Sequence, residues 1–228
     1  MGTRFTLLRP GIVAYQDAWS LQQRIAADVR GGADESLILL EHPPTYTLGA
    51  RGDTGNLLLS EAAFASRGAA VVRSDRGGDV TFHGPGQIVG YPIVNLRARG
   101  EGPVWYVRHV EALLIDTLAR FDIVAHRAQG RPGVWCSDEK IAAIGVRVSG
   151  GVTTHGFALN VNTDLTWFRH IVPCGLADAG VTSMREIARG EFALTDVENA
   201  ITQEFAERFN VTLDVQREAA MTGASVGR

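Results

Sequence analysis

The sequence is poor in lysine and cysteine and has no long apolar run. Lys140 is the only lysine of the 228 residues, although lysine and arginine together number 22, so arginine supplies nearly all the positive charge. Two cysteines, Cys136 and Cys174, are too few for a disulfide framework. No run of about 18 apolar residues occurs, and the first ten residues lack a signal-peptide core. We therefore expect a cytoplasmic protein with reduced thiols.

The charge and the spacing of potential ligands exclude several classes of partner. The formal net charge is −3 and the isoelectric point is about 6.1, which argues against nucleic-acid binding. Neither cysteine belongs to a Cys-x-x-Cys pair and the histidines lack metal-site spacing, so we expect no metal. The sequence also lacks a phosphate-binding loop. We expect no cofactor, no nucleic acid and no membrane as partners.

Hydrophobic periodicity predicts a mixture of helices and strands without regular βαβ alternation. Helical spacing indicates helices over 14–29, 103–121 and 195–209, the last with Thr195 and Glu198 as a capping box, and Ser60 caps a short one. Apolar β-compatible runs predict strands over 36–40, 45–48, 87–96, 141–148, 152–161 and 211–215. The glycines at 150 and 151 predict a hairpin.

This order predicts an α+β fold in which helices flank a mixed, largely antiparallel sheet. No linker composition divides the chain, so we predict one catalytic domain over 1–217 and a flexible C-terminal tail over 218–228.

The segment from Arg76 to Gln87, RGGDVTFHGPGQ, is the most distinctive part of the chain. It contains four glycines and a proline around a short strand-like Thr-Phe-His run. Glycine allows positive φ angles and close backbone approach, so the segment is typical of a ligand-binding loop. An ordinary Gly-rich hairpin end has the same composition and remains an alternative.

Two side chains are candidates for covalent chemistry. Cys174 lies between Pro173 and Gly175, which fix the backbone on both sides of the thiol. A free thiol ionises near pH 8.5 and needs a neighbouring base or cation, which Lys140 at the start of an apolar run could supply. An inert buried cysteine and a solvated lysine remain open alternatives. Histidines 42, 83 and 155 are competing bases or structural residues.

Four blocks of the sequence, in order, resemble the lipoyl(octanoyl) transferase family. They are RGGDVTFHGPGQIVGYPI over 76–93, KIAAIG over 140–145, HGFALN over 155–160 and PCG over 173–175. The resemblance implies the fold of biotin and lipoate protein ligases, which is class II aminoacyl-tRNA synthetase-like. It also implies transfer of an octanoyl group from octanoyl-acyl carrier protein to a lysine of lipoyl domains, in 2-oxoacid dehydrogenase complexes and in the glycine cleavage H protein.

In this family Cys174 would carry the acyl group as a thioester and Lys140 would move the protons. The resemblance assigns substrate binding to Arg76, Gly77, Gly78, Asp79, Val80, Thr81, Phe82, His83, Ala143, Ile144, Gly145, Gly156, Phe157 and Ala158. Since both protein partners are typically acidic, we expect arginines to contribute to docking, among them Arg73, Arg76, Arg131 and Arg147.

Two features of the sequence depart from the family pattern, and two other functions remain as alternatives. Cys136 is an extra thiol that we interpret as incidental, and Arg51 follows Gly49 one residue later than the family pattern. An ATP-dependent lipoate or biotin ligase on the same fold would not need Cys174 as a nucleophile. A non-catalytic acyl-binding module would leave that thiol inert.

Overall fold

The computed structural model describes residues 3–172 and 180–216, and within them it contains strands, helices and two 3₁₀ turns. The strands are β1 (Thr3–Ile12), β2 (Glu35–Glu41), β3 (Thr45–Leu48), β4 (Ala70–Arg73), β5 (Val80–His83), β6 (Gln87–Ile93), β7 (His126–Ala128), β8 (Arg131–Cys136), β9 (Glu139–Ser149), β10 (Val152–Asn160) and β11 (Val211–Gln216). The helices are α1 (Tyr15–Arg30), α2 (Glu61–Ala65), α3 (Leu96–Arg99), α4 (Pro103–Ala119), α5 (Met184–Ala188) and α6 (Leu194–Phe209). The 3₁₀ turns are η1 (Thr54–Asn56) and η2 (Leu165–His170).

Eight of the strands form one mixed sheet in the order β11-β1-β2-β6-β10-β9-β8-β7. The strands β11, β1 and β2 run parallel to one another, and every later neighbour is antiparallel. This arrangement confirms the predicted α+β class with a mixed, largely antiparallel sheet. The hairpin of β9 and β10 is also confirmed, and its turn uses Gly150 and Gly151 at φ +62° and +87°.

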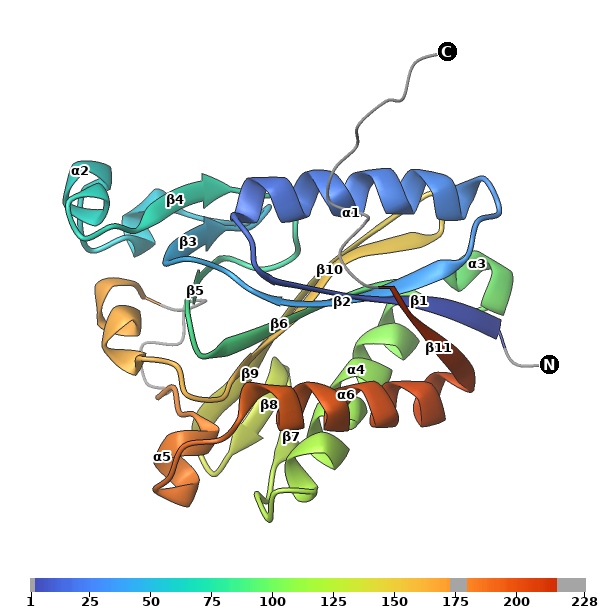
Figure 1. Ribbon diagram of the computed structural model, residues 1–228. Coiled ribbons are helices and arrows are strands. Elements are labelled where there is room, and N and C mark those ends of the chain that lie inside the picture. The colour runs from blue at the N-terminus through green and yellow to red at the C-terminus, as the bar shows by residue number, and fades with distance from the viewer. Residues whose placement is uncertain (1–2, 173–179, 217–228) are drawn as a thin grey trace.

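Helices cover both faces of this sheet (Figure 1). Helix α1 lies across one face and α4 with α6 across the other, with β11 directly after α6. The α4/α6 side holds the main core, where Phe5, Leu113, Phe205 and Phe209 are fully or almost fully buried. None of the helices within the described residues combines the length and apolarity needed to cross a membrane.

A second, three-stranded sheet of order β4-β3-β5 lies beside the N-terminal end of α1 (Figure 1). Its own core contains Tyr46, Phe64 and Phe82, and Trp167 from η2 stacks on Phe82 at 5.3 Å between ring centroids. This small sheet fixes β5 and therefore the Gly-rich segment that surrounds it.

Two sequence predictions fail in local detail, and several strands were not predicted. Strand β1 was not predicted, because Pro10 interrupts its apolar pattern; the sheet register shifts between Leu8 and Gly11, which accommodates a residue without an N–H. The capping box at Thr195 is wrong, because α6 begins at Leu194 with Ala193 at its N-cap. The strand predicted to reach residue 96 ends at Ile93, since Asn95 caps α3. Strands β7 and β8 were also not predicted.

Two expectations concern parts of the chain outside the described residues. The tail over 218–228 is one, and Cys174 is the other. The single-domain boundary at 217 therefore stays a prediction.

Candidate functional site

A cavity of about 600 Å³ opens between the Gly-rich segment and the strands β6, β9 and β10. The side chains of Gln87, Val89 and Tyr91 line it at every second position of β6, as strand alternation requires. Tyr15, at the start of α1, lines it from the opposite layer. This part of the cavity therefore lies on the α1 side of the main sheet, while Val107 of α4 lines it elsewhere.

Most of the residues that the sequence pointed to meet at this cavity. Its lining includes Arg76, Gly77, Gly78, Asp79, Val80, Thr81, His83, Lys140, Ala143, Ile144, Gly145, Gly156, Phe157 and Ala158. Phe82 is the exception among the described residues, because alternation along β5 turns its ring into the core of the small sheet. Cys174 lies outside the described residues. Three separate segments of the sequence, 76–83, 140–145 and 156–158, thus line one cavity.

The Gly-rich segment lies against the backbone of β9 without an intervening side chain. The Gly77 N–H donates to the Val146 carbonyl at 3.0 Å, so this hydrogen bond ties the segment to β9. A Cβ atom added to Gly145 would lie 2.8 Å from the Gly77 carbonyl oxygen, which is closer than real Cβ contacts. Gly78 adopts a φ of +93°, which favours glycine. These glycines are required for a close approach that keeps one side of the cavity narrow.

Arg76 is a buried hydrogen-bond donor within the small sheet and the loop. Its Nη2 donates to the carbonyl oxygens of Thr47 and Asp79, both at 2.6 Å, and its Nη1 to Gly77 at 3.0 Å. Only 7% of the residue is exposed. The expectation that Arg76 contributes to partner docking is therefore wrong, because its guanidinium stabilises the loop from inside.

Lys140 lies at the start of β9 and lines the cavity. Its N–H donates to the Gly180 carbonyl at 2.9 Å, and its own carbonyl accepts from Thr182 N–H at 3.0 Å. Its Nζ lies 4.9 Å from the centroid of the buried Trp135 ring, within the range of a cation–π interaction. The side chain is half-buried, so the alternative of a fully solvated lysine at a strand end does not describe it.

Cys136 faces the main core and is nearly buried. Burial, with a smaller contribution from Glu139, raises the pKa of its thiol to about 11. Because the thiolate is the nucleophile, this cysteine is unreactive near neutral pH. That agrees with its interpretation as incidental.

The three candidate histidines are buried and neutral, and each has hydrogen-bond partners on both ring nitrogens. His42 donates from Nδ1 to the Val13 carbonyl at 2.6 Å and accepts the Tyr91 hydroxyl at Nε2 at 2.7 Å. Burial lowers its pKa to about 4. His155 donates from Nε2 to Asp75 at 2.7 Å, and burial lowers its pKa more than Asp75 raises it.

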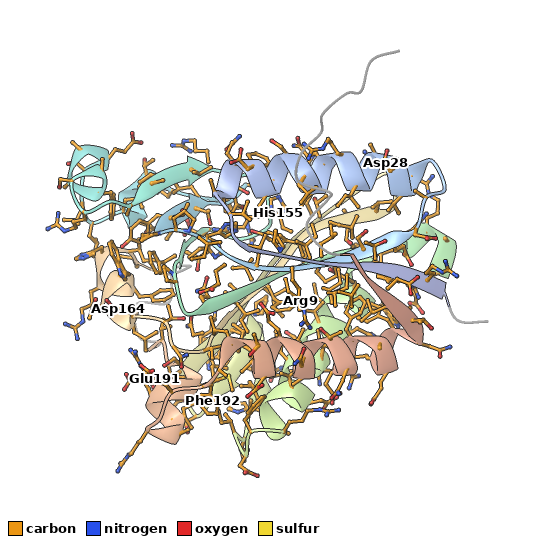
Figure 2. The ribbon with its side chains drawn as sticks, viewed as in Figure 1. Arg9, Asp28, His155, Asp164, Glu191 and Phe192 are labelled. Atoms are coloured by element: carbon orange, nitrogen blue, oxygen red, sulfur yellow. The ribbon has the colours of Figure 1, made fainter. Side chains whose placement is uncertain are left out.

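His155 also has an unusual backbone. Figure 2 labels it beneath α1, and its N–H donates to the Gln22 side chain of that helix at 2.7 Å. Its φ of +57° is strained for a non-glycine residue and costs on the order of 1–3 kcal/mol. The ion pair of Asp75 with Arg147, 3.3 Å between Oδ2 and Nε, fixes the partner of the imidazole.

Sequence reasoning missed several residues that line or support the cavity. Tyr15, Asp75 and Tyr91 are examples, and neither Gln87 nor Asn160 was named as a site residue. Strand alternation could have identified two of them. Gln87 and Tyr91 share one face of a strand whose other face is wholly apolar.

Comparisons with known proteins agree with this geometry. The model of the lipoyl protein ligase A/B catalytic domain family matches residues 14–206. The chain is 48% identical over 202 residues to an octanoyltransferase of Rubrobacter xylanophilus, covering 87% of this chain and 90% of that protein. It is 46% identical to an octanoyltransferase of Geotalea uraniireducens, covering 86% and 88% of the two chains.

Solved structures share the fold at low sequence identity. A lipoate-protein ligase A bound with ATP gives a TM-score of 0.77 at 14% identity, covering 96% of this chain and 91% of that one. The protein Ta0514 of T. acidophilum with bound lipoic acid gives 0.75 at 15% identity, covering 97% and 92%. The biotin protein ligase of Aquifex aeolicus gives 0.51 at 10%, covering 92% and 70%. The expected likeness to lipoate and biotin ligases is confirmed for the fold.

Proposed function

Because this chain belongs to the lipoyl protein ligase A/B catalytic domain family, we propose that it is an octanoyltransferase that acts in protein lipoylation. The reaction moves an octanoyl group from octanoyl-acyl carrier protein to the side-chain amine of a lysine in a lipoyl domain. A cytoplasmic location is part of the proposal.

The observation that carries the proposal is the continuity of one narrow cavity with Lys140. The backbone of Gly77, Gly78 and Gly145 and the small side chains of Ala143 and Ala158 leave room for an alkyl chain along this wall of the cavity. Lys140, the single lysine of the protein, lines the same cavity. An acyl chain bound there has its reacting end within reach of an amine.

In the first half-reaction Cys174 attacks the thioester carbonyl of the octanoyl donor. Lys140 accepts the thiol proton, a new C–S bond to Cys174 forms, and the bond to the phosphopantetheine sulfur breaks. The departing thiolate takes the proton back from Lys140. The products are an octanoyl-Cys174 thioester and free carrier protein.

In the second half-reaction the acceptor lysine attacks the octanoyl-Cys174 carbonyl. Lys140 takes the proton that the amine loses, the amide bond forms, and the C–S bond to Cys174 breaks. Proton return from Lys140 to Cys174 restores the enzyme. No ATP is consumed, because the thioester already activates the acyl group.

The acceptors we propose are lipoyl domains of 2-oxoacid dehydrogenase complexes and the glycine cleavage H protein. One structural neighbour, 17% identical with a TM-score of 0.76, is a bi-partite lipoate protein ligase described together with its E2 lipoyl domain. Arg51 and Arg131 line the cavity and are better placed to meet an acidic partner than the buried Arg76. The apparent KM for the carrier protein should rise with salt, and a salt-independent KM would contradict this docking mode.

Intact-protein mass spectrometry tests the proposal. Incubation with octanoyl-acyl carrier protein and no ATP should add one octanoyl group at Cys174, and a lipoyl domain should then remove it. Cys174→Ser should give no thioester adduct and no transfer. Strict ATP dependence would instead identify an adenylating ligase, and binding without turnover would identify an acyl-binding module.

A further inference from the structure

We propose that Gln87 and Asn160 are positioning residues that connect the cavity wall to the backbone on which Lys140 is held. The inference rests on the proposed function for the role of Lys140. It concerns two buried amide side chains that make no covalent chemistry themselves.

The Asn160 end of the connection has a defined direction. Asn160 donates from Nδ2 to the Thr182 carbonyl at 3.0 Å, and a carbonyl can only accept. The Asn160 Oδ1 is therefore free to accept, and it does so from Gln87 Nε2 at 2.9 Å. Gln87 Nε2 also donates to the Phe82 carbonyl at 3.2 Å. Two backbone carbonyls thus fix the orientation of both amides.

The Gln87 end continues to the Gly-rich segment through His83. Gln87 Oε1 accepts from His83 Nδ1 at 2.9 Å, and His83 Nε2 accepts the Thr47 hydroxyl at 3.3 Å. The Thr47 Oγ1 in turn accepts from Arg76 Nη2 at 2.9 Å. Burial holds the pKa of His83 well below its usual range, with a smaller contribution from His42. A neutral imidazole with its proton on Nδ1 is the form that these partners require.

The Thr182 end reaches Lys140 directly. Val181 forms a parallel bridge with Lys140, while the N–H groups of Lys140 and Thr182 donate across it at 2.9 and 3.0 Å. The backbone of Thr182 is therefore held on both sides, by Lys140 through the Thr182 N–H and by Asn160 through the Thr182 carbonyl. The hydrogen bonds run unbroken from Arg76, on the cavity wall, to the first residues of β9.

Burial makes this chain of hydrogen bonds act as one unit. The exposed fractions are 0% for Thr47, 5% for His83, 1% for Gln87, 4% for Asn160 and 4% for Thr182. A buried polar group that loses its partner costs roughly 1–3 kcal/mol, and water cannot easily replace that partner here. A shift at one end is therefore disfavoured unless the other end follows.

These side-chain hydrogen bonds join two strands that are not paired with each other in the sheet. Strands β6 and β9 are separated by β10, so no ladder hydrogen bond joins Gln87 to Lys140. The side chains of Gln87 and Asn160 bridge that gap on the cavity side. They set how Lys140 lies relative to an acyl chain in the cavity.

The test compares Asn160→Asp with Asn162→Asp. Asn162 is a matched control, because its Nδ2 donates to the Phe192 carbonyl at 2.7 Å and its Oδ1 accepts from the Phe192 N–H at 3.1 Å. Phe192, which Figure 2 labels, precedes α6, and the two hydrogen bonds between Asn162 and Phe192 do not involve residues 180–182. Both variants replace an amide donor that faces a carbonyl by a carboxylate.

For Asn160→Asp we expect kcat to fall by roughly tenfold to a hundredfold, with KM for octanoyl-acyl carrier protein changed by less than about threefold. Hydrogen exchange at the amides of Lys140 and Thr182 should become faster. Asn162→Asp should keep the kcat and the exchange of these two amides. Gln87→Glu, which retains the acceptor for His83 and loses the donor to Asn160, should lower kcat in the same way and serves if Asn160→Asp does not fold.

Equal kcat values for folded Asn160→Asp and Asn162→Asp would overturn the inference, as would equal exchange at Thr182. So would a fall in kcat that matches only the unfolded fraction. The exchange measurement does not depend on activity. If the wild type fails to transfer octanoyl groups while the exchange difference between the two variants is present, the proposed function fails and the structural connection stands.

Discussion

The two faces of β6 and β10 differ sharply, although they are built from alternating residues of the same strands. On the α1 face, Gln87, Tyr91 and Asn160 border a cavity, and their polar groups are paired with one another, with histidines or with backbone carbonyls. On the α4/α6 face, Ile88 and Leu159 lie in a continuous apolar core. A sheet of this kind can carry chemistry on one face and most of the stability on the other, because strand alternation separates the two sets of side chains.

The largest effect should come from removing the amine on the cavity face. Lys140→Ala should lower kcat for octanoyl transfer by roughly 10²–10⁴-fold, the range for loss of a general acid–base group. The melting temperature should change little, because the backbone bonds of residue 140 remain. Lys140→Arg should not restore the rate, since a guanidinium does not give up its proton near neutral pH. A Lys140→Ala enzyme with near wild-type kcat would mean that another base acts.

On the core face a large truncation should affect stability and leave the chemistry intact. Phe205 is fully buried and stacks on Phe209 at 4.4 Å, so Phe205→Ala should lower the free energy of unfolding by roughly 3–5 kcal/mol. Urea denaturation measures this loss, and kcat per folded molecule should stay at the wild-type value. Val124→Ala is the control, because Val124 is 88% exposed. A specific loss of kcat in Phe205→Ala would show that the two faces are coupled.

Adding a methyl group where β9 and the Gly-rich segment touch should lower the rate less than the loss of Lys140. In Gly145→Ala the new Cβ would lie 2.8 Å from the Gly77 carbonyl, so the loop must move. We expect kcat/KM to fall by about tenfold to a hundredfold, since small displacements at a reacting site are costly. Gly190→Ala serves as the control, because its Cβ would meet nothing closer than 4.0 Å. An unchanged kcat/KM in Gly145→Ala would show that loop position does not control the reaction.

The buried histidines should make stability depend on pH. His42 has a folded-state pKa of about 4 and an unfolded one near 6.5, so the unfolded state binds the proton more readily between these values. The free energy of unfolding should therefore be unaffected above pH 6.5 and fall below it, by about 1.4 kcal/mol per pH unit for each such histidine.

Urea titrations from pH 7.5 to 4.5 measure this slope. His42→Gln should reduce it, since glutamine can donate to Val13 and accept from Tyr91 without titrating. His126→Gln, at an exposed position, should keep the wild-type slope. An unchanged slope in His42→Gln would show that His42 is not the group responsible.

Several elements were predictable because their signals are local. Helix α4 follows from Pro103 and apolar residues at helical spacing, and the β9–β10 hairpin follows from two glycines between β-rich runs. Ser60 caps α2 as expected, accepting from the Ala63 N–H at 3.3 Å. In contrast, β1 depends on pairing with β2 and with β11, which lies some 200 residues further along the chain. The residues around Pro10 therefore carry no local pattern that predicts pairing with these two strands.

The candidate site was predictable where a motif is contiguous and less so where residues meet through the fold. The Gly-rich segment and Lys140 stand out in the sequence by composition, and both line the cavity. Phe82 is the exception, because the direction of its ring is set only when β5 pairs with β3. Asp75 gains its role only when β10 brings His155 to within 2.7 Å.

By itself the sequence determined the fold class, the resemblance of four blocks to an acyltransferase family, and the choice of Lys140 as the candidate base. These depend on residue type and local spacing. Only the tertiary structure decided that Arg76 is buried, that Phe82 faces away from the cavity, and that Gln87 and Asn160 link the cavity wall to Lys140. The reason is physical: hydrogen bonds and close contacts are satisfied between strands that are distant in the chain, and their geometry exists only after the sheet has formed.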